Sequence, residues 1–313
     1  MLYIGIDVGG TNLKAGLVND DGEILAVART PLGVFQSPEW FAETLAKLAR
    51  EVMVQKGVSA GEVAWVGIGI PGAVSGGEVL YTANIPMSHV PLEKLFRQHL
   101  DIPVLLGNDA DCAAVAEWTC GAGRGMKNFL VATLGTGLGG GMILNGRLHT
   151  GMGAGGEIGH IVICEGGVPC NCGRRGCWEA YASATGLIRL TKEAMEKHPE
   201  SVLHTIAAES GVEGRTAFQA AEQGDKTALE VCADYARYLA SGLVSMINIL
   251  HPEAVALGGG VAAAPDELLL KPVREIAARE CYARHTDQVP HILRAEMGND
   301  AGIIGAALLG RAI

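Results

Sequence analysis

The chain has no surplus of positive charge. Its 313 residues include 24 Lys and Arg against 34 Asp and Glu, so the formal net charge is −10. Without a basic surplus the protein cannot displace counterions from phosphates, which makes nucleic acid and anionic lipid unfavourable partners. Proline-rich and repetitive tracts are also missing, and 49% of the residues are hydrophobic. Disordered and collagen-like chains are thereby excluded, and a packed protein is expected.

Long hydrophobic runs are absent as well. The longest apolar run, at residues 239–250, is too short to cross a bilayer and contains Ser241, Ser245 and Asn248. Near the N-terminus, Asp7 interrupts the first apolar stretch, so the charged-then-apolar pattern of a secretory signal is missing. We therefore expect neither export nor membrane insertion, and a cytoplasmic location.

Glycine, in contrast, is in excess: 44 of the 313 residues, about 14%, which is twice the usual share. Two glycine-rich turns, the first glycine tip (residues 7–12, Asp-Val-Gly-Gly-Thr-Asn) and the second glycine tip (residues 135–141, Gly-Thr-Gly-Leu-Gly-Gly-Gly), each lie between apolar strand-like runs. The pattern predicts two β-hairpins in an internally duplicated chain. A Walker-type phosphate loop is not expected, because strands follow both tips and Gly-Lys-Ser/Thr is absent.

Helix-like and strand-like segments alternate between the tips, which predicts an α/β fold. The predicted segments are helices at 38–56, 91–99 and 110–119, strands at 63–70, 104–106 and 254–257, and a terminal helix from Ala301. No linker is visible. The duplication alone places a domain boundary within residues 117–125.

Each glycine tip is either a plain hairpin turn or a phosphate cradle. Glycine lets backbone N–H groups approach an anion, while Thr11 and Asn12 can donate further hydrogen bonds and Lys14 can add positive charge. Asp7 would then hold hydrated magnesium. Two such tips could bind different phosphates of one nucleotide. For the glycines at 258–260, the alternatives are a tight turn or close approach of the backbone to an adenosine.

Asn108 and Asp109 follow an apolar strand and precede a helix. One interpretation is a helix N-cap, for which both residue types are preferred. The other uses the C-terminal edge of the strand, where α/β proteins place their chemistry. Asp109 would accept a proton from a substrate hydroxyl, and Asn108 would bind a neighbouring hydroxyl. The two interpretations are compatible if one residue caps the helix.

Four of the eight cysteines lie within residues 164–177 of a chain without a secretory signal, which favours a metal over disulfides. His160, Cys170, Cys172 and Cys177 supply four ligands, enough for a closed, structural zinc site. The metal-held loop would place two carboxylates, Glu157 and Glu179, where they can accept hydrogen bonds from sugar hydroxyls. Cys164 is interpreted as a buried apolar residue, with replacement of one ligand as the alternative. The other four cysteines occupy helix-like positions and are expected in the core: Cys112, Cys120, Cys232 and Cys281.

These motifs together resemble the ROK family of sugar kinases and sugar-responsive repressors over the whole chain. The motifs are the two glycine tips, Asn108-Asp109, Glu157-x-x-His160, Cys170-x-Cys172-Gly-x-x-Gly-Cys177-x-Glu179 and residues 298–302 (Gly-Asn-Asp-Ala-Gly). The cysteine motif is highly specific to that family. Residues 182–186 (Ala-Ser-Ala-Thr-Gly) resemble its bacterial glucokinase branch.

The resemblance implies a two-lobed, actin-like (ribonuclease-H-like) ATPase fold with the active site in a central cleft. It implies a small α/β domain at 1–118, joined by the C-terminal helix at 300–313, and a larger α/β domain at 119–299 with the zinc loop. Asp109 would be the catalytic base that takes the proton from the 6-hydroxyl of the sugar for attack on the γ-phosphorus of MgATP. The matching sugar positions are Gly72, Asn84, Asn108, Glu157, His160 and Glu179, and the matching nucleotide positions are Gly10, Thr11, Thr136, Gly137, Gly259 and Gly260. The glycine tips add Asp7, Gly9, Asn12, Lys14 and Gly135 to the candidate nucleotide site. His160 would serve both zinc and sugar.

We therefore expect an ATP-dependent hexose kinase, and a glucokinase first among the possible substrates. A kinase for N-acetylmannosamine, N-acetylglucosamine or allose is the alternative, because it would share every chemical residue. A non-catalytic sugar-sensing regulator is less expected, since the family's repressors carry a winged-helix segment before the kinase-like part, whereas this chain starts its first strand at Leu2. The family also implies a homodimer.

Overall fold

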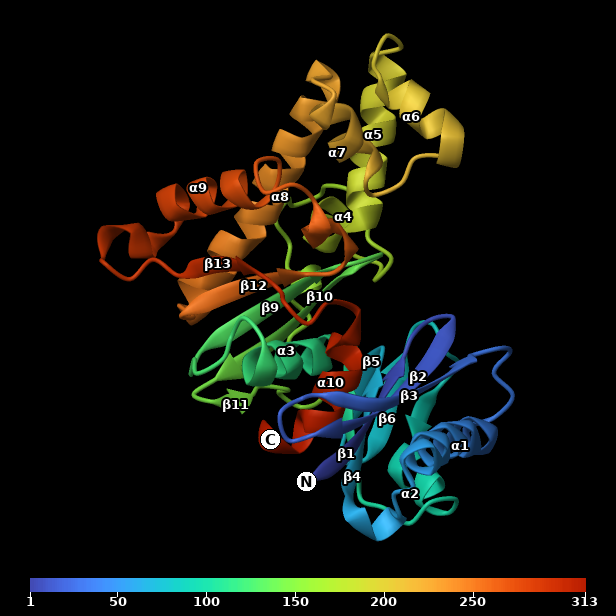
Figure 1. Cartoon of the computed structure of the whole chain (residues 1–313). Helices are drawn as coiled ribbons and strands as arrows, with labels where there is room; N and C mark the ends of the chain where they lie inside the picture. The colour runs from blue at the N-terminus through green and yellow to red at the C-terminus, as the bar shows by residue number, and fades with distance from the viewer. The chain divides into compact units, whose positions relative to one another are not determined.

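The computed structural model describes residues 1–313, which form two compact units (Figure 1). Unit one comprises residues 1–131, 141–156 and 296–313, and unit two comprises residues 132–140 and 157–295. The domain boundary at 118/119 stays a prediction. None of the helices has both the length and the apolar character that a bilayer crossing requires.

The main sheet of unit one has the strand order β3-β2-β1-β4-β8. Its strands are β1 (Leu2–Val8), β2 (Asn12–Asn19), β3 (Ile24–Pro31), β4 (Val63–Ile70) and β8 (Val104–Asn108). The first three strands are antiparallel, whereas β1, β4 and β8 are parallel. Fully buried side chains such as Ile4, Leu17, Phe41 and Ile68 form the core. A small sheet of β5 (Gly72–Ser75), β6 (Glu78–Thr82) and β7 (Ser88–Val90) completes the strands of this unit.

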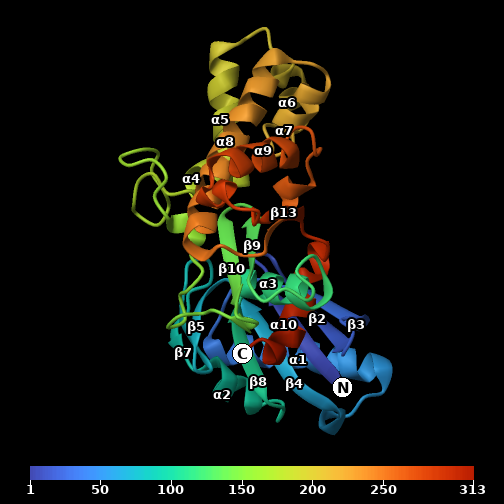
Figure 2. The same ribbon diagram turned by 90° about the vertical axis from the view of Figure 1, so that its left-hand side faces the viewer.

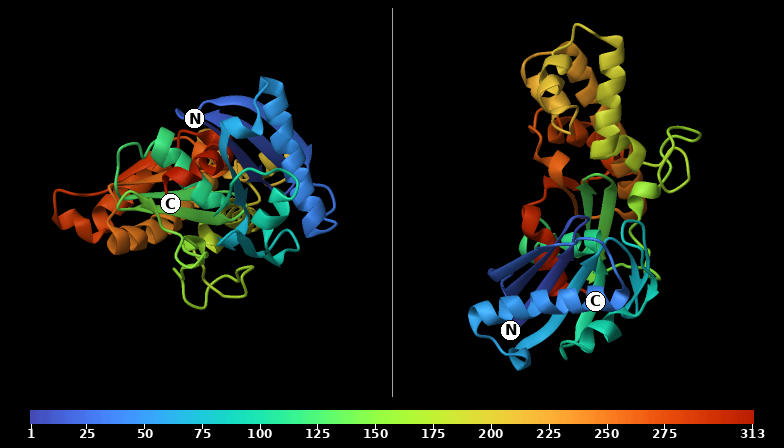
Figure 3. Two further views of the ribbon diagram at one scale, coloured as in Figure 1. Left: turned by 90° about the horizontal axis from the view of Figure 1, so that it is seen from below. Right: turned by 90° about the vertical axis from the view of Figure 1, so that its right-hand side faces the viewer.

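The helices of unit one pack on this sheet, and local sequence explains the bounds of α1 (Pro38–Lys56), which crosses the strands (Figure 3). The Oγ of Ser37 accepts the N–H of Trp40 at 3.1 Å, which caps the first turn. Gly57 ends the helix with φ 65°, a left-handed conformation that glycine adopts without strain. The predicted helix at 38–56 is therefore confirmed. The other helices are α2 (Leu92–Arg97), α3 (Asp109–Cys120) and α10 (Ala301–Leu308).

Part of the glycine excess serves helix packing. A Cβ on Gly67 of β4 would lie 1.7 Å from the carbonyl oxygen of Ala306 in α10, and one on Gly305 would lie 1.6 Å from that of Cys112 in α3. Only glycine permits so close an approach of a helix backbone. Gly67 and Gly305 lie outside the two glycine tips and outside the glycines at 258–260.

The second sheet has the order β11-β10-β9-β12-β13 and is flanked by helices (Figure 2). Its strands are β9 (Phe129–Leu134), β10 (Leu138–Leu144), β11 (Arg147–Leu148), β12 (Ala254–Gly258) and β13 (His291–Arg294). The helices of unit two are α4 (Glu179–Ala182), α5 (Ala184–Lys197), α6 (Leu203–Ser210), α7 (Thr216–Glu222), α8 (Lys226–Leu250) and α9 (Leu270–Glu280). Strand β10 begins at Leu138, inside the second glycine tip, although glycine has a low strand propensity. A Cβ on Gly141 would lie 2.6 Å from the carbonyl oxygen of Ala110, so α3 packs on this glycine.

Glu117 of α3 is a buried carboxylate, 1% exposed, that holds backbone groups in place. Its Oε2 accepts the N–H groups of Ala122 at 3.1 Å and Glu296 at 3.0 Å, and its Oε1 accepts that of Met297 at 2.7 Å. These bonds fasten the segment that leads into α10 to helix α3.

Replacing Glu117 by Gln should destabilise the protein by about 2–4 kcal/mol, because one amide oxygen cannot accept all three N–H groups and those left over stay buried without a partner. The shift in the urea unfolding midpoint measures the loss. Glu296→Gln is the matched control, since the Glu296 side chain is exposed and keeps its backbone bond. Equal midpoints for the two variants would contradict the assignment.

Candidate active site

The carboxyl ends of three parallel strands in unit one meet at one edge of the sheet. Asp7 of β1 is in register with Gly69 of β4, and Gly69 is in register with Gly107 of β8. Asp7, the Pro71-Gly72 turn and Asn108 therefore lie at the same edge. Ligand sites of α/β proteins are found at this edge, so the fold brings these predicted residues together.

Of the two roles that the sequence left open, the structure shows which residue caps helix α3. Asn108 is the N-cap of α3: its Oδ1 accepts the N–H groups of Ala110 at 2.8 Å and Asp111 at 3.3 Å. Its Nδ2 donates to the carbonyl of Gly72 at 3.1 Å, which leaves one amide hydrogen for a ligand. Asp109 is the first residue of the helix, and its Oδ1 accepts the N–H of Ala110 at 2.9 Å.

Asp7 is half-buried at the end of β1, and burial raises the pKa of its carboxyl group. The ammonium of Lys14, on the paired position of β2, lies 3.9 Å away and acts in the opposite direction on this pKa. A Cβ on Gly302 of α10 would lie 2.7 Å from the Asp7 Cγ, so this glycine leaves room for the carboxylate. A half-buried carboxylate with one distant ammonium partner fits a residue that faces a hydrated cation.

The other predicted residues of unit one lie on turns. Gly72 begins β5, and Asn84 is exposed in the turn between β6 and β7. In the first glycine tip, the N–H of Gly9 donates to the carbonyl of Asn12 at 3.0 Å, and the Asn12 Nδ2 donates to the Thr11 Oγ1 at 3.0 Å. Gly10 is exposed, and a Cβ there would meet nothing within 4 Å. The fold itself therefore does not require glycine at position 10.

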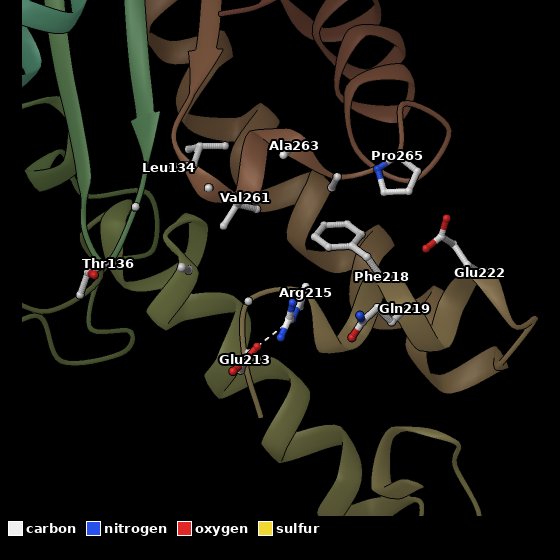
Figure 4. A pocket seen from close by; sticks show the side chains of 15 residues that line it. Leu134, Thr136, Glu213, Arg215, Phe218, Gln219, Glu222, Val261, Ala263 and Pro265 are labelled. Carbon is white, nitrogen blue, oxygen red and sulfur yellow. Dashed lines mark ion pairs between the residues drawn. The ribbon is translucent and has the colours of Figure 1, made fainter. Parts of the chain in front are cut away.

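Unit two holds residues 135–140 of the second glycine tip, beside a pocket of about 630 Å³ (Figure 4). Predicted nucleotide residues Gly135, Thr136 and Gly260 line it, and Gly259 adjoins it with φ 83°. This tip therefore lies together with the glycines that follow β12. A largely apolar pocket next to glycine-rich turns suits a nucleoside.

The sequence motifs do not predict the rest of this pocket. Figure 4 shows the ring of Phe218 facing the segment that carries Val261 and Pro265, and an ion pair between Arg215 and Glu213, whose Nε and Oε2 are 2.8 Å apart. The missed residues include Glu213, Arg215, Phe218, Gln219, Glu222, Val261 and Pro265. They come from α7, from the segment before it and from the segment after β12, and no local motif links these parts of the chain.

The predicted metal ligands converge. The chain segment that carries the cysteines forms an irregular loop next to α4 (Figure 2). The ligand atoms of His160, Cys170, Cys172 and Cys177 all lie within 4.8 Å of one another. The Cys170 Sγ is 3.7 Å from the His160 Nδ1, and the sulfurs of Cys172 and Cys177 are 3.6 Å apart. A tetrahedral zinc site with Zn–S bonds of about 2.3 Å has edges of roughly 3.8 Å, so the donors fit this metal.

A tight backbone turn and the protonation of a thiol both affect metal binding by this cluster. Gly173, with φ 89°, donates its N–H to the Cys170 carbonyl at 3.0 Å and makes the tight turn between two of the thiols. Burial raises the pKa of the Cys170 thiol to about 12. Metal ligation needs thiolates, so a bound cation would release protons here.

Two cysteines differ from their predicted environments. Cys164 is exposed, not buried, and is not one of the four clustered donors. Its carbonyl would lie 1.7 Å from a Cβ on Gly176, so the chain folds back there and leaves the thiol outside. Cys120, expected in the core, is half-buried at the end of α3, where its Sγ donates to the Asp21 carbonyl at 3.5 Å.

The two predicted sugar-binding carboxylates of unit two flank the cluster. Glu157 is exposed and immediately precedes the short 3₁₀ turn Ile158–His160. Glu179 is half-buried at the start of α4, and its Oε1 lies 3.6 Å from the Cys170 Sγ. The structure thus places Glu157, His160 and Glu179 on the two chain segments that bring in the metal ligands.

Known proteins resemble the chain throughout its length. The glucokinase of Halalkalibacterium halodurans is 38% identical over 312 residues, which cover 98% of this chain and 94% of that protein. An N-acetylmannosamine kinase of Escherichia coli is 32% identical over 315 residues, covering 99% of both. The crystal structure of a ROK family glucokinase from Streptomyces griseus in complex with glucose and AMPPNP matches with a TM-score of 0.82 at 35% identity, covering 99% of both chains.

The structural match confirms the predicted fold class, a mixed α/β fold of the actin-like ATPase type. The sequence model of the ROK family matches residues 3–313. Relatives above 30% identity extend over the same length, and the chain therefore belongs to the ROK family.

Proposed function

We propose that the protein is an ATP-dependent hexose kinase that phosphorylates the 6-hydroxyl of glucose, with Asp109 as the general base. The observation that carries the proposal is the placement of Asp109 at the carboxyl edge of the sheet that also holds Asp7, in a chain 38% identical to a glucokinase. A base candidate and a candidate holder of a cation on one sheet edge suit phosphoryl transfer, which depends on positioning and charge neutralisation.

In the proposed reaction, Asp109 accepts the proton of the 6-hydroxyl while that oxygen attacks the γ-phosphorus of ATP. The bond between the γ-phosphorus and the β–γ bridging oxygen breaks, and ADP leaves with its electron pair. Gly72, Asn84, Asn108, Glu157, His160 and Glu179 are proposed to bind the sugar. Asn108 contributes its one remaining amide hydrogen, since the others of its polar atoms already bond to backbone.

The two glycine tips and the 630 Å³ pocket are proposed to bind the nucleotide. Magnesium would be held through Asp7 and supplies charge neutralisation on the phosphates when it is bound. Zinc would be held by His160 and the three clustered cysteines and supplies rigidity to the loop that carries Glu157 and Glu179. With all four ligand positions taken by protein atoms, the zinc site leaves no place for a reacting group.

A coupled assay of ADP release, run with ATP over a panel of hexoses and N-acetylhexosamines, tests the proposal. Glucose should give the highest kcat/KM of the panel. Absence of turnover with every sugar would contradict the assignment as a kinase. Turnover with another sugar alone would contradict the assignment of glucose.

An N-acetylmannosamine kinase is the second candidate, favoured by the relative of that name at 32% identity over 99% of this chain. The proposed chemical residues are the same, so the two functions differ only in the sugar that is bound. The same panel separates them, since this candidate predicts the highest kcat/KM with N-acetylmannosamine.

Gly10→Ala should weaken ADP binding about tenfold with little effect on the thermal midpoint. The added methyl meets nothing in the chain but lies where the proposed phosphate approaches the backbone. Gly61→Ala is the control, because its methyl also meets nothing and Gly61 lies outside the tips. Calorimetric titration with ADP measures the affinity. Equal affinity in the two variants would exclude Gly10 from the nucleotide site.

A further inference from the structure

We propose that Glu179 and Thr185 are positioning residues for the second glycine tip, so that the metal-held loop sets nucleotide affinity even without sugar. The inference rests on the proposed function and assigns to Glu179 a second task besides sugar binding. All residues concerned belong to unit two.

Glu179 reaches the tip directly. Its Oε2 accepts the N–H of Leu138 at 2.9 Å, at the residue where the tip passes into β10. A Cβ on Gly137 would lie 2.3 Å from that oxygen, so a larger residue at 137 would displace the carboxylate from this position. The other carboxylate oxygen is the one that lies 3.6 Å from the Cys170 Sγ. One side chain therefore contacts both the tip and the metal cluster.

The same loop also confines Leu138 from its other side. A Cβ on Gly159 would lie 2.1 Å from the Leu138 carbonyl oxygen, so the turn that precedes His160 packs against the tip backbone. The chain segments on both sides of the cysteine loop thus abut one residue. A shift of this loop on metal loss would move both contacts together.

Residues after α4 hold the first half of the tip. The N–H of Ala184 donates to the Gly135 carbonyl at 2.8 Å, and the Thr185 Oγ1 donates to the Thr136 carbonyl at 2.7 Å. Both carbonyls thereby point toward α5, and the tip closes with a bond of 3.0 Å from the Gly135 N–H to the Gly137 carbonyl. Thr136 itself stays exposed, beside the 630 Å³ pocket.

Trp178, the residue that precedes Glu179, is held in place by burial and a hydrogen bond. Its indole is fully buried and donates to the Tyr238 carbonyl at 3.1 Å, and a Cβ on Gly242 would lie 2.1 Å from the ring. Cys177, a proposed metal ligand, is also fully buried. Glu179 therefore follows two fully buried residues, which suits a side chain that fixes the position of another segment.

Two substitutions at Glu179 separate the effect of its hydrogen bond with the Leu138 N–H from the effect of its negative charge. Glu179→Gln removes the charge but keeps an oxygen that can accept the Leu138 N–H, whereas Glu179→Ala removes both. We expect Glu179→Ala to bind MgADP about tenfold more weakly than Glu179→Gln in the absence of sugar. Glucose affinity should fall in both variants. Glu157→Ala is the control that is expected to lower glucose affinity without changing MgADP affinity, because Glu157 makes no hydrogen bond to the tip.

Thr185 tests the same inference away from the proposed sugar residues. Thr185→Val should weaken MgADP binding three- to fivefold and leave glucose affinity unchanged, and Thr185→Ser should restore wild-type binding through its hydroxyl. Removing zinc from the wild-type protein with a chelator should also weaken MgADP binding measured without sugar.

Calorimetric titration of each protein with MgADP and, separately, with glucose decides the matter. Equal MgADP affinity for Glu179→Ala and Glu179→Gln, or for Thr185→Val and Thr185→Ser, would overturn the positioning role while the proposed function stands. A wild-type protein that binds neither MgADP nor glucose would overturn the proposed function and this inference with it.

Discussion

Asp109→Asn is expected to lower kcat about 10²- to 10⁴-fold, the usual contribution of a general base, while glucose affinity stays within about threefold of wild type. Asparagine has nearly the same shape as aspartate, and its Oδ1 can keep the bond from the Ala110 N–H. What it loses is the capacity to accept the proton of the 6-hydroxyl. ADP release measures kcat, and a titration with glucose measures affinity.

Asp101→Asn provides the matched control for this charge change. Asp101 lies just before β8, at the end of the strand opposite Asp109, and its side chain is 84% exposed in an ion pair with Arg97. This variant should retain full activity. If Asp109→Asn kept more than about a tenth of the wild-type kcat, Asp109 would be excluded as the base.

Cys172→Ser should abolish stoichiometric zinc and, with it, most of the glucose affinity. Losing one of four ligands removes a large part of a binding free energy that reaches about 10 kcal/mol or more for structural zinc. Cys172 is exposed, so the replacement of sulfur by oxygen disturbs no core packing. The loop that carries Glu157 and Glu179 would then lose its fixed geometry. Metal analysis and a glucose titration on the same sample measure the two losses.

Cys164→Ser tests whether this effect belongs to the cluster. Cys164 lies in the same loop and is also exposed, but it is not one of the four clustered donors. Its variant should keep one zinc per chain and wild-type glucose affinity. Absence of zinc from the unmodified protein, or equal zinc content in both variants, would contradict the proposed metal site.

Local patterns predicted most of the elements that carry the site. The hairpin around the first glycine tip, the helix at 38–56 and the strand that ends at Asn108 all have signals within one short window: alternating apolar residues, a serine cap and a glycine stop. The clustering of the four proposed metal ligands was also predicted from a local pattern, because three of them lie within eight residues. Spacing along the chain is a good guide when the chain folds back on itself locally.

Local sequence patterns did not predict the contacts between segments that are distant in the sequence. Glu117 reads as an ordinary helical residue, and only the packing of residues 296 and 297 against it makes it a buried anchor. Phe218 and Val261 line one pocket although they are 43 residues apart in the sequence. The glycines that β4 and α10 use for close packing also carry no local signal. Glycine is needed at these positions only because the backbone of another element comes close to them in the folded chain.

The identity of the product tests the central claim most directly. Incubation of the protein with ¹³C-labelled glucose and ATP, followed by ¹³C and ³¹P NMR of the mixture, shows which sugar oxygen receives the phosphoryl group. We expect glucose 6-phosphate and ADP in equal amounts. Phosphate on any other carbon, or ADP accompanied by inorganic phosphate and unchanged glucose, would contradict it.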